Sequence, residues 1–484
     1  MIGAGLGGLG TAALLARQGY TVSVFEKNEQ SGGRASLLQD AGFSWDMGPS
    51  WYLMPDVFER FFGLLGERVE DHLELQRLTP SYRIFFEDGD TVDMTGVLEQ
   101  DAATFESYEP GAADRLREYL RLSEYQYDIA MRDFVPKNYD SFRDFLTPTV
   151  MRQGPKLHVF ESMDRYVARF FTHPKLRKIV QYTLVFLGSS PYSTPALYNI
   201  MAHVDFNLGV WYPNGGVYEL VRVLERIAIG HGAEFHCSSP VEEIVVQDGQ
   251  VSGVRTPRGI YPADIVVSNA DLAFTETRLL EPRYRTYGEK YWRKRTLAPS
   301  AFIMYLGVRG RLPELAHHNL YFCEDWKENF AQLFDRPAYP DDPSIYVCCP
   351  SRTDPDVAPE GCENLFILVP VAPGLEDDEA IRERYSIHIL DLVAAKMHVP
   401  DLRERILVQH VFSVNDFAER YNAYKGTALG LAHTMRQSAV MRPNNRSKKV
   451  RGLYYVGANT NPGVGMPMCL ISAELVQKRV MHGK

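Results

Sequence analysis

Apolar positions follow two different periods along this chain, and the two periods alternate along its whole length. An Ala- and Leu-rich helical stretch runs to Gly19, and a short apolar strand follows it at 21–25. Helical periods recur over 116–131, 163–186, 217–229 and 379–397. Strand-like runs occupy 82–86, 91–94, 241–246, 251–254, 265–267, 301–307, 344–349 and 365–370. This alternation predicts an α/β fold with α+β segments inserted into it.

The turn before the first helix carries a glycine motif for dinucleotide binding. Gly3, Gly5 and Gly8 fit the pattern G-x-G-x-x-G. Glycine is needed there because the turn is tight, the backbone must approach a pyrophosphate, and the helix must pack close to the strand. Free N–H groups at the helix N-terminus would face the phosphates. Glu26 ends the next strand, where a carboxylate accepts hydrogen bonds from ribose hydroxyls. A βαβ unit without a ligand is the weaker interpretation, because strand, helix, strand and acid occur in order.

The strand before this motif is short. Only Met1 and Ile2 precede Gly3, whereas a strand averages about 5–6 residues. A parallel sheet needs a full central strand. We therefore expect the reading frame to continue upstream of Met1 with a few β-branched residues, which the preceding codons can show.

Composition narrows the class of protein. A chain of 484 residues with 45% hydrophobic content predicts two or three domains. A net charge of −9 argues against nucleic acid as a partner. The six cysteines form no C-x-x-C pair, and His231 and His236 have no metal-ligand spacing, so we expect a reduced cytoplasmic compartment and no metal site. No apolar run reaches the ~18–20 residues of a membrane span, although a protein can also lie on a membrane surface.

The C-terminus supplies a second motif. Residues 452–466 predict a strand, a glycine turn at Gly457 and a loop, and a helix begins in 467–473. A strand that ends at glycine and opens a helix forms a backbone cradle for polar atoms. A terminal strand–helix unit without a ligand explains this segment equally well by itself. Together with the N-terminal unit, it predicts a returning strand that closes around a flavin.

The chain resembles the bacterial-type carotenoid desaturases, the phytoene and diapophytoene enzymes of the FAD-dependent amine oxidase superfamily. The similar segments are Gly32-Gly33-Arg34, Asp46–Pro49, Met54–Phe58, Asp342–Val347, Ala358–Gly361, Asn415–Phe417 and Tyr454–Ser472. The last segment departs from the family at Tyr455, Asn459 and Asn461, where an aliphatic residue, a small residue and most often a histidine occur. The resemblance spans nearly the whole chain and suits both the C30 and the C40 branches.

The resemblance implies a Rossmann-like two-dinucleotide-binding FAD domain interleaved with an α+β substrate domain and a helical cap. The FAD domain would comprise three segments, 1–80, 206–298 and 446–484. Residues 81–205 would form a substrate-domain hairpin and a membrane-facing helical cap, and 299–445 the rest of the substrate domain.

The resemblance also implies noncovalent FAD, with Arg34 against the FAD phosphates. The residues expected to bind the cofactor are Gly3, Gly5, Gly7, Gly8, Glu26, Lys27, Gly33, Arg34, Gly48, Pro49, Ser50, Val241, Gly457, Ala458, Pro467 and Met468.

The implied reaction introduces double bonds into a linear, hydrophobic polyene. Such a dehydrogenation removes a hydride equivalent and a proton, and only a cofactor can take the electron pair. Segments 45–53, 165–186 and 302–305 could line a dry tunnel, with ordinary core as the alternative. No catalytic base is identified from the sequence. The polar residues near the Gly215-Gly216 turn, which surface solvation explains as well, are His203, Asp205 and Glu219.

Two other classes of function stay open. One is a different flavin enzyme, such as an amine oxidase, a porphyrinogen oxidase, or a polyene saturase or isomerase. The other is a flavin-free prenyl-lipid binding protein of the same fold. A visible absorption spectrum separates the second class from the flavin enzymes, and feeding phytoene or diapophytoene separates a desaturase from the first class.

A water-insoluble substrate predicts peripheral contact with membrane lipid on the cytoplasmic face. The expected contact is the region 156–178, with a solvated helix packed on the domain as the alternative. Its basic and aromatic residues are Lys156, Arg165, Arg169, Lys175, Arg177 and Lys178 beside Phe160, Tyr166, Phe170 and Phe171. The sequence does not indicate an oligomeric state.

Overall fold

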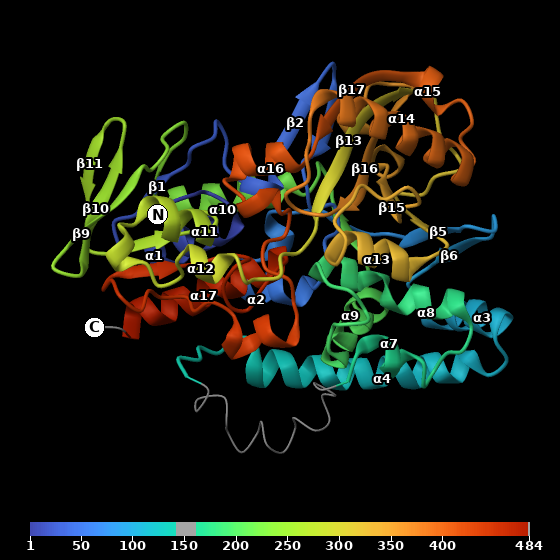
Figure 1. Cartoon of the computed structure of the whole chain (residues 1–484), viewed down its shortest axis with the longest axis horizontal. Coiled ribbons are helices and arrows are strands. Elements are labelled where there is room, and N and C mark those ends of the chain that lie inside the picture. The colour runs from blue at the N-terminus through green and yellow to red at the C-terminus, as the bar shows by residue number, and fades with distance from the viewer. Residues whose placement is uncertain (142–160, 483–484) are drawn as a thin grey trace.

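The computed structural model describes residues 1–141 and 161–482. A small parallel sheet at one end is assembled from distant parts of the chain (Figure 1). Strand β1 (Ser23–Phe25) pairs with β8 (Glu234–His236), and β12 (Val266–Ser268) pairs with β18 (Leu453–Tyr455). Ile2 stands between these pairs and bridges both Phe25 and Ser268. The two sequence motifs therefore meet in one sheet.

Helices cover this sheet closely. Helix α1 (Leu6–Arg17) is buried from Leu6 to Ala16 and packs against α10 (Tyr218–Gly230) and α17 (Met466–His482). Helix α2 (Pro55–Leu65) packs against both α1 and α17. A methyl group at Gly10 would lie 3.0 Å from both Leu470 and Phe61, so glycine lets these helices approach one another.

A seven-stranded sheet forms the other end of the molecule. Its order is β17-β13-β16-β15-β14-β5-β6, and within the described strands of this sheet only the β14–β5 pair is parallel. The bounds are β5 Tyr82–Phe86, β6 Thr91–Met94, β13 Ser300–Arg309, β14 His318–Phe322, β15 Ile345–Cys348, β16 Cys362–Val371 and β17 Ile406–Phe412. Helices α13 (Trp326–Phe334) and α14 (Glu379–Lys396) accompany this sheet (Figure 1). Strands β13 and β15 are buried on both faces, which explains their continuous apolar sequences.

Short helices gather below this sheet in Figure 1. They are α3 Leu98–Tyr108, α4 Ala112–Ile129, α7 Met163–Val167, α8 Pro174–Gln181 and α9 Ile200–Ala202, with a π-helical turn at Ala130–Phe134 and a 3₁₀ turn at Tyr182–Leu187. The helical period predicted over 163–186 is thus broken into three pieces. Pro174 begins a new helix, because proline cannot continue the preceding one.

The remaining elements are smaller. They are β2 Leu37–Asp40, β3 Phe43–Asp46, β4 Leu75–Arg77, β7 Trp211–Pro213, β9 Glu243–Gln247, β10 Gln250–Thr256, β11 Gly259–Pro262, α11 Leu272–Phe274, α12 Glu289–Trp292, α15 Leu402–Arg405 and α16 Val414–Tyr421.

Strands β14 and β17 of the seven-stranded sheet were not predicted. β17 alternates half-buried and exposed residues, and β14 begins with the polar pair His318-Asn319, so neither reads as an apolar run.

The predicted membrane contact at 156–178 stays a prediction, and the residues that the structure describes weigh against it; Lys156 and Phe160 lie outside them. Tyr166 and Phe171 are buried in the core, and Phe170 packs against it. Four of the basic side chains have acidic partners: Arg169 has Glu161, Lys175 has Asp88 and Asp90, Arg177 has Asp164, and Lys178 has Glu87. These contacts favour the alternative, a helix packed on the domain. Within residues 1–141 and 161–482 no helix is both long enough and apolar enough to span a membrane.

Candidate active site

A cavity of about 1440 Å³ extends between the parallel sheet and the seven-stranded sheet. A typical ligand pocket holds ~300–1,000 Å³, so this cavity has room for a dinucleotide and a second, elongated molecule. Its walls come from the two glycine motifs at one side and from β13, β14, β15 and β16 at the other. The helical part closes it with residues such as Tyr182 and Leu197.

The two glycine motifs touch each other at the edge of the cavity. A Cβ atom at Gly7 would lie 3.3 Å from the Gly457 Cα, and one at Gly8 would collide with the Gly3 carbonyl oxygen. The Asn269 side chain lies in the same place, 2.7 Å from a Cβ at Gly5 or at Gly7. Asn269 was missed in the sequence. Its position directly after β12, at the carboxyl end of a parallel strand, is the signal that could have identified it.

Glu26 is held rigidly beside this motif. One of its carboxylate oxygens accepts from the Ala4 N–H at 2.8 Å and the other from the Asn28 N–H at 2.9 Å. Each oxygen retains a further lone pair, and Glu26 lines the cavity. Lys27 follows it and donates to the Glu419 carbonyl, and burial lowers the pKa of the Lys27 ammonium.

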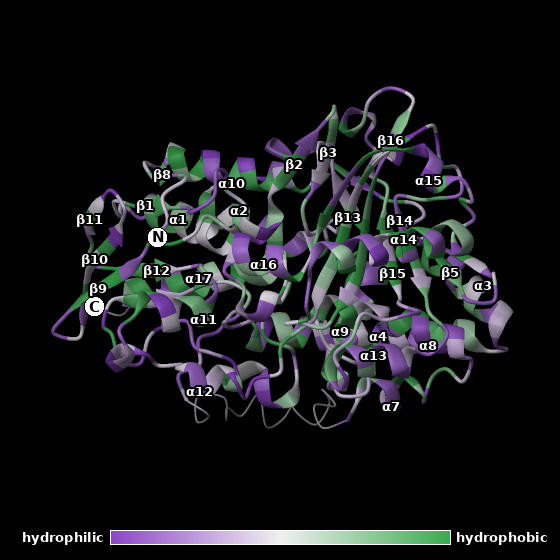
Figure 2. Cartoon of the chain, turned by 45° about the horizontal axis from the view of Figure 1, so that its top comes forward, coloured by the Kyte–Doolittle hydropathy of each residue, from purple (hydrophilic) through white to green (hydrophobic). Residues whose placement is uncertain are grey.

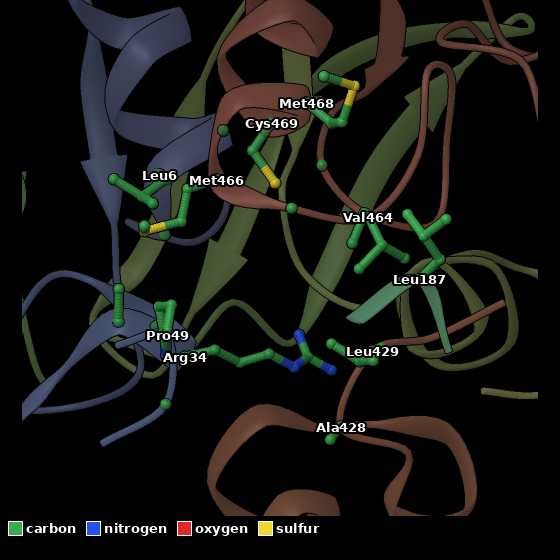
Figure 3. A pocket seen from close by; sticks show the side chains of 18 of the residues that line it. Leu6, Arg34, Pro49, Leu187, Ala428, Leu429, Val464, Met466, Met468 and Cys469 are labelled. Carbon is green, nitrogen blue, oxygen red and sulfur yellow. The ribbon is translucent and has the colours of Figure 1, made fainter. Parts of the chain in front are cut away.

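The guanidinium of Arg34 points into the cavity and is incompletely bonded. Its Nε is buried and makes no hydrogen bond within the described chain, and one Nη reaches the Thr427 carbonyl only at 3.4 Å. The group also lies 5.5 Å from the centre of the Tyr421 ring. Figure 3 shows it extending toward Leu429. A buried cation with an unused donor is suited to an anionic group such as a phosphate.

Two helix N-termini face this cavity. Helix α1 has no side-chain cap and no acid in its first turn, and α17 has no acid in its first turn either. The positive ends of both helix dipoles are therefore available to an anion or a polarised carbonyl. Cys469 lies in the first turn of α17, and burial raises the pKa of its thiol to about 11. The thiol is protonated near neutral pH, which disfavours a covalent bond to a cofactor.

The second part of the cavity is mostly apolar. Figure 3 shows Leu187 beside Val464, and Leu429 next to the end of the Arg34 side chain. Tyr182 and Val185 line the wall from the predicted segment 165–186. Ala301 and Ile303 line it from β13, whereas Phe302 and Tyr305 do not, although both were predicted to. Side chains alternate across a strand, which places Phe302 on the opposite face. Tyr305 shares the face of Ala301 and Ile303, but it is 1% exposed and donates its hydroxyl to the Met47 carbonyl at 2.8 Å.

Segment 45–53 likewise contains residues that line the cavity and residues that belong to the core. Met47, Gly48, Pro49, Ser50, Trp51 and Leu53 line the cavity. Trp45 is 1% exposed and donates its indole N–H to the Leu306 carbonyl at 3.3 Å, so it belongs to the core. This segment therefore connects the apolar part of the cavity to the glycine motifs.

Two buried groups of hydrogen-bonded polar side chains reach the cavity wall. Tyr182 and Tyr82 both donate to the Asp205 carboxylate, at 3.0 Å and 2.8 Å, and burial raises the pKa of that carboxyl to about 7. His203 and Asp205 are 6% and 3% exposed, so the interpretation of these two residues as solvated surface is wrong. Tyr82, Tyr182 and Asp205 come from segments that are far apart in the chain, so sequence spacing cannot reveal this group.

The second hydrogen-bonded group is centred on His433. Its Nε2 accepts from the Val464 N–H at 3.3 Å, so Nδ1 carries the proton and donates to the Tyr198 hydroxyl at 2.6 Å. Ser438 lies 3.1 Å from the same hydroxyl. Burial keeps the pKa of His433 well below its usual value, so the imidazole is neutral. Tyr198, His433 and Ser438 all line the cavity.

One further polar cluster lies behind Trp51. The ligand atoms of His317, His318 and Cys348 lie within 4.8 Å of one another, and all three residues are buried. The His318 ring stacks on Trp51 at a centroid distance of 4.1 Å. The sequence did not reveal this grouping, because Cys348 meets His318 only through the antiparallel register of β14 and β15. We assign no ion to it.

The sequence from residue 6 to residue 481 matches the family described as "Flavin containing amine oxidoreductase". The chain belongs to this family. Among curated relatives, the carotenoid 3,4-desaturase of Haloarcula japonica is 52% identical over 98% of this chain and 96% of its own length. The zeta-carotene-forming phytoene desaturase of Myxococcus xanthus is 38% identical over 99% and 93%. An oxidoreductase structure from Methanosarcina mazei has a TM-score of 0.64 and 18% identity, covering 99% of both chains, which shows a shared fold.

The predicted fold class, the FAD cofactor and the oxidoreductase class are thereby confirmed. The cavity of this flavoenzyme also suits the cofactor, because it combines the uncapped N-terminus of α1, a buried carboxylate and a guanidinium with an unsatisfied Nε. All sixteen residues predicted to bind FAD line the cavity except Gly8, which packs α1 against Gly3. Their individual contacts with FAD stay a prediction.

Replacing Asp205 with asparagine in this flavoenzyme is expected to change the pH dependence of its stability. The folded carboxyl keeps its proton up to about pH 7, whereas the unfolded one loses it near 3.8. The folded state thus binds more protons in that window, and the contribution of Asp205 to stability is lost as pH rises through it. The free energy of unfolding is measured in urea for both proteins at several pH values in this range. As pH rises, the value for the wild type minus that for the variant should fall by about 4 kcal/mol. A constant difference would contradict the assignment.

Proposed function

We propose that this flavoenzyme desaturates a linear carotenoid precursor. The observation that carries the proposal is the continuity of the cavity, in which an apolar part lined by Leu187, Leu197 and Ile303 opens directly onto the glycine motifs. An unbranched polyene is long, apolar and narrow, and such a space suits it. The curated relatives that act as carotenoid desaturases support the same substrate class.

The chemistry follows from the positions of these groups. When bound, FAD supplies the two-electron acceptor that side chains lack. One hydrogen would leave the polyene as a hydride equivalent, with the electron pair of its C–H bond. The neighbouring carbon loses a proton, and the electron pair of that second C–H bond becomes the new π bond. The apolar walls orient the reacting carbons and exclude water. The Tyr198–His433 pair lines the cavity, but burial keeps the pKa of His433 well below its usual value and its Nε2 already accepts from the Val464 N–H, so we assign the departing proton to no side chain.

The five-segment domain division given above is retained as part of this proposal. Segments 1–80, 206–298 and 446–484 would bind FAD, and 81–205 and 299–445 would bind the polyene. The strand pairs β1–β8 and β12–β18 support this division, because they join the three FAD segments. Noncovalent FAD and peripheral contact with membrane lipid also belong to the proposal.

The test is conversion of defined polyenes. The gene is expressed in cells that accumulate phytoene, diapophytoene or a more unsaturated carotenoid. The extracted carotenoids are separated by chromatography, and their masses are measured by mass spectrometry. A desaturase lowers the mass of at least one substrate by pairs of hydrogen atoms and shifts its absorption to longer wavelength. A gain of hydrogen, a gain of oxygen, or an unchanged mass with altered retention would instead indicate a saturase, an oxygenase or an isomerase.

The relative at 52% identity makes the 3,4 position of a carotenoid the first to examine. Nuclear magnetic resonance of the product locates the new double bond. An amine oxidase of the same family would convert an added amine and leave every carotenoid unchanged.

A further inference from the structure

A strongly basic surface lies beside the cavity on two segments, 283–295 and 434–451. The first contains six basic residues and one acidic residue, Glu289. The second contains six basic residues and no acidic residue, but Arg442 is buried and so does not contribute to the surface. The whole chain carries a net charge of −9, so these segments depart sharply from the rest of the molecule. Helix α12 belongs to the first segment and lies at the lower edge of the molecule in Figure 2.

The two segments form one continuous surface. Gln437 bonds to the backbone of Thr296 in both directions, at 2.9 Å and 2.8 Å. Further along, the Lys449 ammonium donates to the Arg283 carbonyl at 3.2 Å, and the Lys448 N–H donates to the Thr286 hydroxyl at 3.2 Å. We call the exposed side chains of 283–295 and 434–451 the basic surface.

Much of the charge on the basic surface is uncompensated. Arg283 pairs with Glu281, and Arg446 pairs with Asp140. Arg293, Lys294 and Arg436 are exposed, and none of them forms an ion pair within the described parts of the chain. Their positive charge is therefore available to an external partner.

Two exposed methionines lie within the basic surface at the cavity margin. Met435 and Met441 are 51% and 58% exposed. Ser438 lies midway between them in sequence and lines the cavity. Apolar side chains that project from a cationic surface are typical of proteins that rest on anionic lipid.

We propose that the basic surface docks on an anionic lipid bilayer and that Met435 and Met441 enter the boundary between headgroups and acyl chains. The inference rests on the proposed function, since a polyene dissolves in the bilayer and not in water. Basic residues near an anionic membrane are attracted to it, whereas the remaining acidic surface is repelled. Docking there brings the cavity margin at Ser438 to the lipid that holds the substrate.

Vesicle flotation tests the proposal with purified, flavin-loaded protein. Vesicles of phosphatidylcholine alone are compared with vesicles that also contain phosphatidylglycerol, at low and high salt. The wild type should float with the anionic vesicles and be released by salt. The variant Arg293→Glu/Lys294→Glu/Arg436→Glu should bind anionic vesicles at least about tenfold more weakly. Met435→Asp/Met441→Asp should also weaken binding to anionic vesicles. This loss should depend less on salt than the loss in the triple charge-reversal variant.

A matched control reverses three exposed arginines at the far end of the molecule, Arg309→Glu/Arg384→Glu/Arg403→Glu, with the same change in net charge. This control should float like the wild type. Equal losses in both triple variants, or wild-type flotation of the first, would overturn the proposal. Equal flavin content in all variants shows that they are folded.

Conversion of a detergent-dispersed polyene separates this proposal from the proposed function. Conversion in detergent without flotation contradicts the docking surface and leaves the desaturase function intact. Flotation without conversion of any polyene contradicts the function.

Discussion

Gly8→Ala is expected to give a protein that does not retain FAD. The added methyl group would collide with the Gly3 carbonyl oxygen and approach the Asn269 Cβ at 3.3 Å. Both neighbours belong to the backbone or lie next to it, so α1 itself must move away from the strand. The helix N-terminus then leaves the position in which it faces the phosphates. We expect flavin affinity to fall at least about hundredfold, because each 1.4 kcal/mol is tenfold and overpacking typically costs ~1–3 kcal/mol before any loss of phosphate contacts.

Gly63→Ala is the matched control. Gly63 lies in helix α2, and no atom lies within 4 Å of a Cβ built there. The substitution should stabilise the helix by ~0.5–1 kcal/mol and leave flavin binding unchanged. The ratio of flavin absorbance to protein absorbance and the melting temperature are measured for both variants. Full flavin content in Gly8→Ala would show that the close approach of α1 is not required.

Leu187→Trp is expected to abolish desaturation while FAD stays bound. Leu187 lies beside Val464 in Figure 3 and lines the apolar part of the cavity. An indole there would occupy the space through which a polyene must pass to reach the cofactor. A small displacement of the reacting carbons is costly in rate, so we expect kcat/KM to fall at least about hundredfold.

The control for this variant is Leu64→Trp, at a position that is 43% exposed on α2. It should keep wild-type kcat/KM and flavin content. Activity is measured with detergent-dispersed polyene, and the flavin spectrum is recorded for each protein. An active Leu187→Trp enzyme would place the substrate path elsewhere, and a variant that loses flavin would place Leu187 in the cofactor site.

The cofactor cradle could be predicted from the sequence because its determinants are local. Gly3, Gly5 and Gly8 lie within one turn, and Gly457 ends one strand, so short-range backbone requirements identify them. Asn269 was missed because its partners at Gly5 and Gly7 lie far away in sequence. The parallel sheet brings these segments together, and one short motif does not contain that information.

The substrate side was harder to predict, because its determinants depend on which face of an element is buried. Ile303 lines the cavity and Phe302 does not, although both are apolar and adjacent. Tyr166 and Phe171 suggested a membrane contact, but an aromatic residue beside a basic one also occurs in a packed helix whose cations have acidic partners. Asp205 is buried because two tyrosines from separate segments enclose it. Burial of this kind is a tertiary property.

We infer that this chain couples the loss of two hydrogens from a polyene to the reduction of its bound FAD. The most direct measurement mixes flavin-loaded protein with a carotenoid substrate in the absence of oxygen and any other acceptor, and follows the flavin absorbance while the product is weighed. We predict bleaching of the flavin with an equal amount of product that has lost two hydrogen atoms. A product formed without bleaching, or bleaching without loss of hydrogen from the carotenoid, would contradict this account.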